Sequence, residues 1–112
     1  MKKLLIATIL FAAIHVTAAP IDFEHLADCI KVHENSLKYP YGCEYRVNGV
    51  IHGWPDAIAR QKCIALCKKE YAKWDGSGDY FQFLNKVYAK DSRWFLDVEK
   101  LYNQVPKVVN SS

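Results

Sequence analysis

The stretch Glu44–Ile51 reads Glu-Tyr-Arg-Val-Asn-Gly-Val-Ile and decides how the rest of the chain is interpreted. Side chains alternate on both sides of Asn48-Gly49, the dipeptide that most strongly favours a two-residue hairpin turn. Residues 35–54 fit no helical pattern, whereas the segments before and after them do. The sequence therefore predicts a small irregular or β-hairpin excursion inserted into a helical protein.

Four segments carry apolar residues at helical spacing. They span residues 23–33, 55–74, 79–88 and 94–105. Asp22 and Asp79 are placed to favour the starts of the first and third helices, and Pro55 suits the first turn of the second. Gly76-Ser-Gly78 and Pro106 are expected to end the second and fourth helices. We predict a mainly α fold of α+β type, a four-helix body with the hairpin between the first two helices.

The first residues have the pattern of a secretion signal. Lys2 and Lys3 precede an apolar run, Leu4–Val16, which is too short to span a bilayer. Cleavage after Ala18 would leave about 94 residues, enough for one domain with a modest core. We predict a signal peptide at 1–18 and a single domain at 19–112, exported to the periplasm or the extracellular medium.

The charge of the exported part excludes some partners. The chain has fifteen Lys and Arg residues, including Lys2 and Lys3, against twelve acidic residues, so the exported part is close to neutral. A nearly neutral domain has no strong electrostatic field that would attract nucleic acid or a membrane surface, so we expect neither as a partner. Leu26–Cys29 matches a lipoprotein box poorly, and we predict no membrane anchor.

All four cysteines lie in the exported part: Cys29, Cys43, Cys63 and Cys67. An even number of cysteines in an oxidising compartment favours two disulfides. Cys63 and Cys67 are four residues apart on one helix face, so each is expected to pair with Cys29 or Cys43, in either arrangement. The spacing lacks the matching ligands of a zinc site, and we predict no metal and no cofactor.

Glu34 closes the first helical pattern, just before the loop Tyr39-Pro-Tyr-Gly42. Cleaving a glycosidic bond requires an acid that is still protonated near neutral pH, and partial burial against apolar groups provides one. Lysozyme is the standard example of such a glutamate. On local features alone, Glu34 also fits an ordinary carboxylate at a helix end.

A two-carboxylate mechanism needs a second acid across the sugar, and Glu44, Asp56 and Asp91 are candidates without a distinguishing context. A lytic transglycosylase needs only one glutamate, because the sugar's own hydroxyl attacks. Four aromatic residues lie off the helical stripes and are candidates for stacking on sugar rings. They are Tyr39, Tyr41, Tyr45 and Trp54.

The order of several motifs resembles a family of small exported or phage-borne lysozyme-like domains related to lytic transglycosylases. The motifs are Val32-His-Glu34, Tyr39-Pro-Tyr-Gly42, Ala59-Arg-Gln-Lys-Cys63 and Asp79-Tyr-Phe-Gln-Phe-Leu84, followed by Tyr88 and Trp94. The resemblance covers nearly all of residues 24–102. It implies Glu34 as general acid and base, with Tyr41, Gly42 and Tyr88 lining a glycan cleft. The implied substrate is the N-acetylmuramic acid to N-acetylglucosamine linkage of peptidoglycan.

The chain departs from that family at three places. Asn35 replaces a small residue after the glutamate, Cys29 and Cys43 are additions, and the segment Ala89–Asp91 is shortened. A non-catalytic exported module that binds glycan or protein is therefore the alternative. A secreted phospholipase A2 is disfavoured because the Cys63–Cys67 helix lacks the His-Asp pair that such an enzyme needs. The sequence leaves the oligomeric state open.

Overall fold

A computed structural model describes residues 20–104 of the chain. The elements are α2 (Phe23–Glu34), the 3-10 turn η1 (Pro40–Gly42), β1 (Glu44–Val47), β2 (Val50–Gly53), α3 (Asp56–Lys73), α4 (Tyr80–Tyr88) and α5 (Trp94–Gln104). This order confirms the predicted mainly α fold with a small antiparallel sheet between the first two helices. The predicted signal peptide, Val105 and Pro106 lie outside the described residues. Within those residues no helix is long and apolar enough to cross a bilayer.

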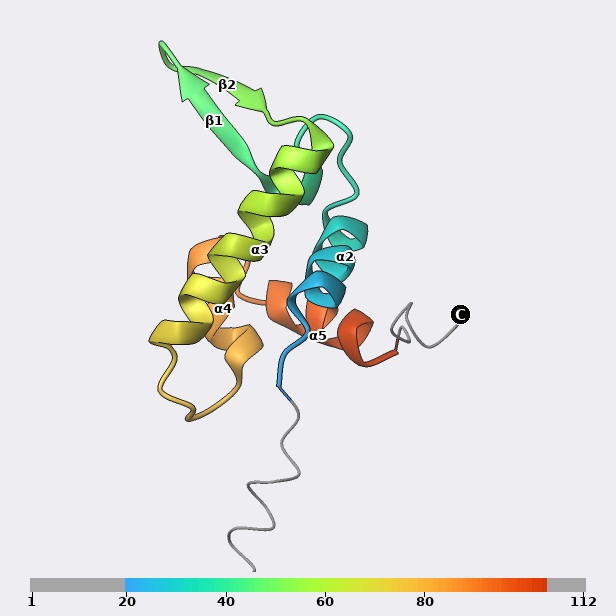
Figure 1. Cartoon of the computed structure of the whole chain (residues 1–112), viewed down its shortest axis with the longest axis vertical. Coiled ribbons are helices and arrows are strands. Elements are labelled where there is room, and N and C mark those ends of the chain that lie inside the picture. The colour runs from blue at the N-terminus through green and yellow to red at the C-terminus, as the bar shows by residue number, and fades with distance from the viewer. Residues whose placement is uncertain (1–19, 105–112) are drawn as a thin grey trace, which may run out of the picture.

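The hairpin forms at the predicted dipeptide. Asn48 and Gly49 have φ angles of 50° and 80°, and both central positions of a two-residue turn with the twist of paired strands require positive φ. The register pairs Tyr45 with His52 and Val47 with Val50. Figure 1 shows the hairpin projecting past the start of α3, away from α4.

The predicted helix starts are also observed. The Asp22 carboxylate accepts a hydrogen bond from the His25 N–H at 3.1 Å, and Asp79 accepts one from the Phe81 N–H at 2.7 Å. Both side chains thereby satisfy amide groups that have no partner inside the helix. α3 begins directly after Pro55, but it ends at Lys73, before the predicted glycine stop. Trp74 leaves the helical conformation there, and its N–H is bonded to the Glu70 and Tyr71 carbonyls.

One core joins all four described helices. Its buried residues are Leu26, Ala27, Ile30, Tyr41, Ala59, Cys63, Cys67, Tyr80, Phe81, Leu84, Trp94 and Val98. α2 packs against α3, α5 and η1, and α4 packs against α3 and α5. The last turn of α2 lies near η1, the start of α3 and the start of α5, as the contacts of Lys31 with Asp56 and of Glu34 with Gly42 and Trp94 show.

Candidate functional site

Glu34 is the last residue of α2, and Asn35 ends the helix. Asn35 has a left-handed backbone (φ 45°, ψ 45°), and its N–H donates to the Lys31 carbonyl at 2.9 Å. Asparagine is one of the few residues other than glycine that adopts this conformation readily. The left-handed backbone of Asn35 thus ends the helix directly after Glu34.

Trp94 fixes one oxygen of the half-buried Glu34. Its indole N–H donates to Oε2 of Glu34 at 2.9 Å, and its ring is buried, with 3% of its surface exposed. The Tyr88 ring stacks on Trp94 with centroids 4.9 Å apart and planes 16° apart, while His33 contacts Trp94 edge-on at 6.3 Å. The carboxylate is therefore held by a directed hydrogen bond from a rigid aromatic group.

Gly42 lies against the other oxygen of Glu34. A Cβ atom at Gly42 would stand 3.0 Å from Oε1, and the backbone there has a φ of +70°. Glycine adopts this conformation without strain and leaves room for the carboxylate. Gly42 is itself exposed, so the contact between Gly42 and Oε1 lies at the protein surface.

Tyr41, which was expected to line a glycan cleft, is buried in the core. Its side chain is 2% exposed, which leaves almost no surface for a ligand, and its backbone is left-handed at φ 61°. Such a conformation costs a non-glycine residue about 1–2 kcal/mol and therefore needs support from its surroundings. The Tyr88 hydroxyl provides that support by donating to the Tyr41 carbonyl at 2.5 Å. Burial raises the pKa of Tyr88 well above its ordinary value, so this hydroxyl keeps its proton.

Arg60 braces the same loop from α3. It donates to the Asp28 carboxylate of α2 at 2.5 Å and to the Tyr41 hydroxyl at 3.4 Å. Among the described residues no Lys or Arg side chain forms an ion pair with Glu34. Arg60 on α3 therefore pairs with Asp28 rather than with Glu34.

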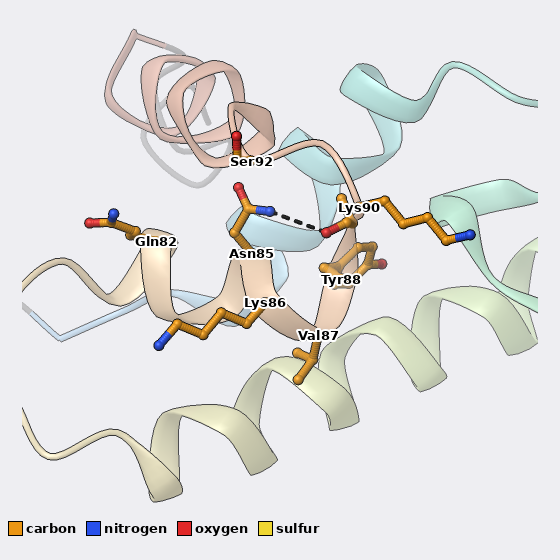
Figure 2. A pocket seen from close by; sticks show the side chains of 8 residues that line it. Gln82, Asn85, Lys86, Val87, Tyr88, Lys90 and Ser92 are labelled. Atoms are coloured by element: carbon orange, nitrogen blue, oxygen red, sulfur yellow. Dashed lines mark hydrogen bonds between the residues drawn. The ribbon is translucent and has the colours of Figure 1, made fainter.

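Tyr88 lines two open pockets. One, of about 800 Å³, lies between α4 and the segment before α5 (Figure 2). Figure 2 shows Lys86 and Lys90 extending in opposite directions from it. The other, of about 460 Å³, is the groove that also contains Gly42, Cys43 and Trp54. The structure thus brings Glu34, Gly42 and Tyr88 together, whereas Tyr39 packs against Gly53 at the base of the hairpin.

The three candidate second acids are in different surroundings. Asp56 forms a 2.8 Å ion pair with Lys31, and the Asp91 carboxylate accepts the Arg93 N–H at 2.9 Å. Glu44 lies on the rim of the groove that contains Gly42. Of the three, Glu44 is therefore the acid that shares a pocket with the candidate site.

All four cysteines are free thiols, and the predicted disulfides are not observed. Cys63 and Cys67 face the core from α3 as packing residues, the Cys29 sulfur lies 3.9 Å from Nε2 of His25, and Cys43 lies 3.8 Å from the Ala59 carbonyl oxygen. The prediction of disulfides from an even number of cysteines was wrong, because thiols also serve as small buried apolar groups. No cluster of His, Cys, Asp or Glu within residues 20–104 could hold a metal ion.

No protein-family model, curated protein or solved structure matches this chain. The functional argument therefore rests on the residues around Glu34.

The sequence did not indicate the role of Trp94 at this site. Trp94 opens the apolar segment 94–105, and its ring is buried. A buried indole N–H generally needs a hydrogen-bond acceptor, and this requirement was the one available signal. It could not identify Glu34, because the two residues are 60 positions apart in the chain.

Proposed function

We propose that this protein cleaves glycan strands of peptidoglycan, with Glu34 as general acid and base. The supporting observation is the asymmetric setting of the Glu34 carboxyl group. Trp94 donates to Oε2, while Oε1 lies beside the exposed Gly42, which has no side chain of its own. One oxygen is thus oriented by the protein and the other is left for a substrate.

Such a carboxyl group can serve a lytic transglycosylase. Protonated Glu34 would give its proton to the glycosidic oxygen as the bond from that oxygen to C1 breaks. The carboxylate would then take the proton of the 6-hydroxyl of the same muramic acid unit, whose oxygen forms a new bond to C1. The product is a 1,6-anhydro sugar, no water is consumed, and Glu34 regains its proton.

Hydrolysis by the same acid is the variant that would use a second carboxylate. Glu44 is then the candidate, because Asp56 and Asp91 are engaged elsewhere. Transglycosylation gives anhydro sugars and hydrolysis gives reducing ends, so analysis of the products distinguishes the two routes.

The experiment is digestion of purified peptidoglycan by the mature protein beside Glu34→Gln, with products read by mass spectrometry. Glu24→Gln, an exposed glutamate on the same helix, is the matched control. We expect anhydro-muropeptides from the wild type and from Glu24→Gln, and none from Glu34→Gln. Reducing-end products would indicate a muramidase, and equal cleavage by Glu34→Gln would overturn the role of Glu34.

A non-catalytic glycan-binding module is the second candidate. The observation in its favour is the aromatic run on the hairpin, where Tyr45 stacks on His52 and contacts Trp54. Aromatic surfaces bind sugars without cleaving them. Sedimentation with insoluble peptidoglycan by folded protein, without release of any product, would support this alternative over the enzyme.

A further inference from the structure

The groove beside Gly42 contains an aromatic surface that the proposed acid chemistry does not use. It is lined by Gly42, Cys43, Glu44, Trp54, Lys62, Ala65, Leu66, Val87 and Tyr88, and its volume is about 460 Å³. Trp54 is half-buried there, and its ring lies 4.2 Å from that of Tyr45, centroid to centroid. The indole is therefore held in place from the hairpin side.

Two charged side chains line this groove. The Lys62 ammonium lies 4.3 Å from the centroid of the Trp54 ring, and Glu44 lines the same groove. Both residues are exposed. Lys62 supplies hydrogen-bond donors and Glu44 supplies acceptors, so the groove has a polar group of each kind.

This combination matches the chemistry of a sugar ring. One face of a pyranose presents C–H groups that pack on an aromatic ring, while its hydroxyls need both donors and acceptors. A pocket with an apolar surface and a few convergent polar groups is the usual form of a small-ligand site. Lys62 is exposed and flexible, so its ammonium can leave the indole face and bond to a hydroxyl of the incoming sugar.

We propose that this groove binds one neutral N-acetylhexosamine unit, stacked on Trp54 and bonded to Lys62 and Glu44. Glu44 would oppose a carboxylate-bearing sugar, because its own charge offsets that of Lys62. The unit is therefore of the N-acetylglucosamine type rather than the muramic acid type. The groove shares Gly42 and Tyr88 with the surroundings of Glu34, so it serves as a neighbouring subsite, an assignment that rests on the proposed function.

The three tryptophans permit a direct test of location. Trp54 reports on the groove and Trp94 on Glu34, while Trp74, whose indole N–H donates to the Ser77 carbonyl at 2.9 Å, is an internal control. The probe is the N-acetylglucosamine tetramer, titrated into ¹⁵N-labelled Glu34→Gln protein so that nothing is cleaved. We expect a saturable shift of the Trp54 indole signal and none at Trp74. The Trp54 signal is assigned with Trp54→Phe.

Calorimetry on variants then tests the polar partners. Lys62→Met and Glu44→Gln should each weaken tetramer binding about threefold to fivefold, since each removes a hydrogen bond of ordinary strength. Trp54→Ala should weaken binding about tenfold through loss of the aromatic stack. Lys68→Met, at an exposed position on the same helix, should bind as the parent does. Spectral dispersion of each variant confirms that it is folded.

An unmoved Trp54 signal, or wild-type affinity in both Lys62→Met and Glu44→Gln, would overturn the proposal. Tighter binding at Trp54 of a muramic-acid-containing tetramer than of the neutral one would overturn the assignment of a neutral unit. Binding at Trp54 by a protein that cleaves no peptidoglycan would leave the subsite standing and the enzyme rejected. Cleavage of peptidoglycan without a Trp54 shift would support the enzyme and reject the subsite.

Discussion

The indole N–H of Trp94 donates a 2.9 Å hydrogen bond to Oε2 of Glu34, which joins the first residue of α5 to the last residue of α2. Because α2 also packs along α5, this bond depends on the whole helical body being assembled. The neighbouring stack of Tyr88 on Trp94 extends the connection to α4 and, through the Tyr88 hydroxyl, to the η1 turn. Three helices and a loop thus converge on one carboxyl group.

Replacing Trp94 with phenylalanine tests this hydrogen bond. Phe retains a ring to stack on Tyr88 but cannot donate to Glu34. Loss of the indole donor leaves Oε2 without its partner, at a cost of about 1–3 kcal/mol, so we expect peptidoglycan cleavage to slow about tenfold to a hundredfold. The loss should appear in kcat, with KM nearly unchanged, because the buried Trp94 has almost no surface for a substrate to contact.

Stability is the control for that variant. Cleavage is measured well below the melting temperature of Trp94→Phe, so that unfolding does not reduce the rate. A rate equal to that of the wild type would show that the indole N–H does not position Glu34. A change in KM alone would assign Trp94 to substrate binding.

A methyl group at Gly42 should displace Glu34. In Gly42→Ala the new Cβ would lie 3.0 Å from Oε1, tighter than an ordinary van der Waals contact. Gly49 is a matched control, because its φ of +80° imposes similar backbone strain while no atom lies within 4 Å of its would-be Cβ. Both variants should lose about 1–2 kcal/mol of stability from the left-handed backbone.

The two glycine variants should differ in activity. We expect Gly42→Ala to lose most cleavage and Gly49→Ala to retain it, at temperatures where both are folded. Equal activity in the two would mean that the close approach of Gly42 to Glu34 has no functional role. Denaturant unfolding measures the stabilities, and release of soluble muropeptides measures the activities.

The fold was predictable wherever a local rule determines the structure. Asn48-Gly49 predicts its turn because few other dipeptides adopt positive φ at both positions, and Asp79 predicts a helix start because its carboxylate reaches the nearby amides. Periodicity was less exact about burial. The apolar Val87, in the predicted helix 79–88, is 51% exposed, whereas the charged Glu70 is buried beside Lys73.

The site was only partly predictable, because its geometry depends on tertiary packing. Glu34 and Gly42 were identified from adjacent motifs, whereas the contribution of Trp94 required the docking of α5 on α2. Tyr41 shows the reverse situation. Its place in an irregular loop suggested an exposed ring, but the left-handed backbone turns the ring into the core.

Asn85 should be essential for holding the segment between α4 and α5. Its side chain is buried and donates to the Ala89 and Asp91 carbonyls at 3.3 and 2.9 Å, while its Oδ1 accepts the Phe95 N–H at 2.8 Å. Asn85→Ala should lose about 2–4 kcal/mol of stability, because buried backbone groups lose their partners. Asn103→Ala, at an exposed position on α5, should be nearly neutral in the same denaturant titration.

Thiol accessibility should follow burial. Cys29, Cys63 and Cys67 are at most 3% exposed, and Cys43 is half-buried. Burial also raises the pKa of Cys43, and it raises that of Cys29 to about 11, so few thiolates are present near neutral pH. We expect slow labelling of Cys43 alone in the native protein, and four reactive thiols after denaturation without reductant. Cys43→Ser should abolish the native reaction, and a denatured count below four would contradict the free-thiol assignment.

The Glu99–Asp79 pair should make stability depend on pH. Burial, followed by a hydrogen bond to Asp79 and the charge of that residue, raises the pKa of Glu99 from 4.5 to about 7. The folded protein therefore holds this proton more tightly than the unfolded chain does. Its contribution to stability is fully present below pH 4.5 and is lost as the pH rises through about 7.

Glu99→Gln should remove that dependence, because a neutral amide keeps a donor toward Asp79 at every pH. We expect the variant to gain stability over the wild type as the pH rises from 4.5 to 7, with the difference levelling off above pH 7. Asp97→Asn, at an exposed position on the same helix, should follow the wild-type profile. Urea unfolding across this range measures each profile, and a constant difference between Glu99→Gln and wild type would show that Glu99 does not titrate in this window.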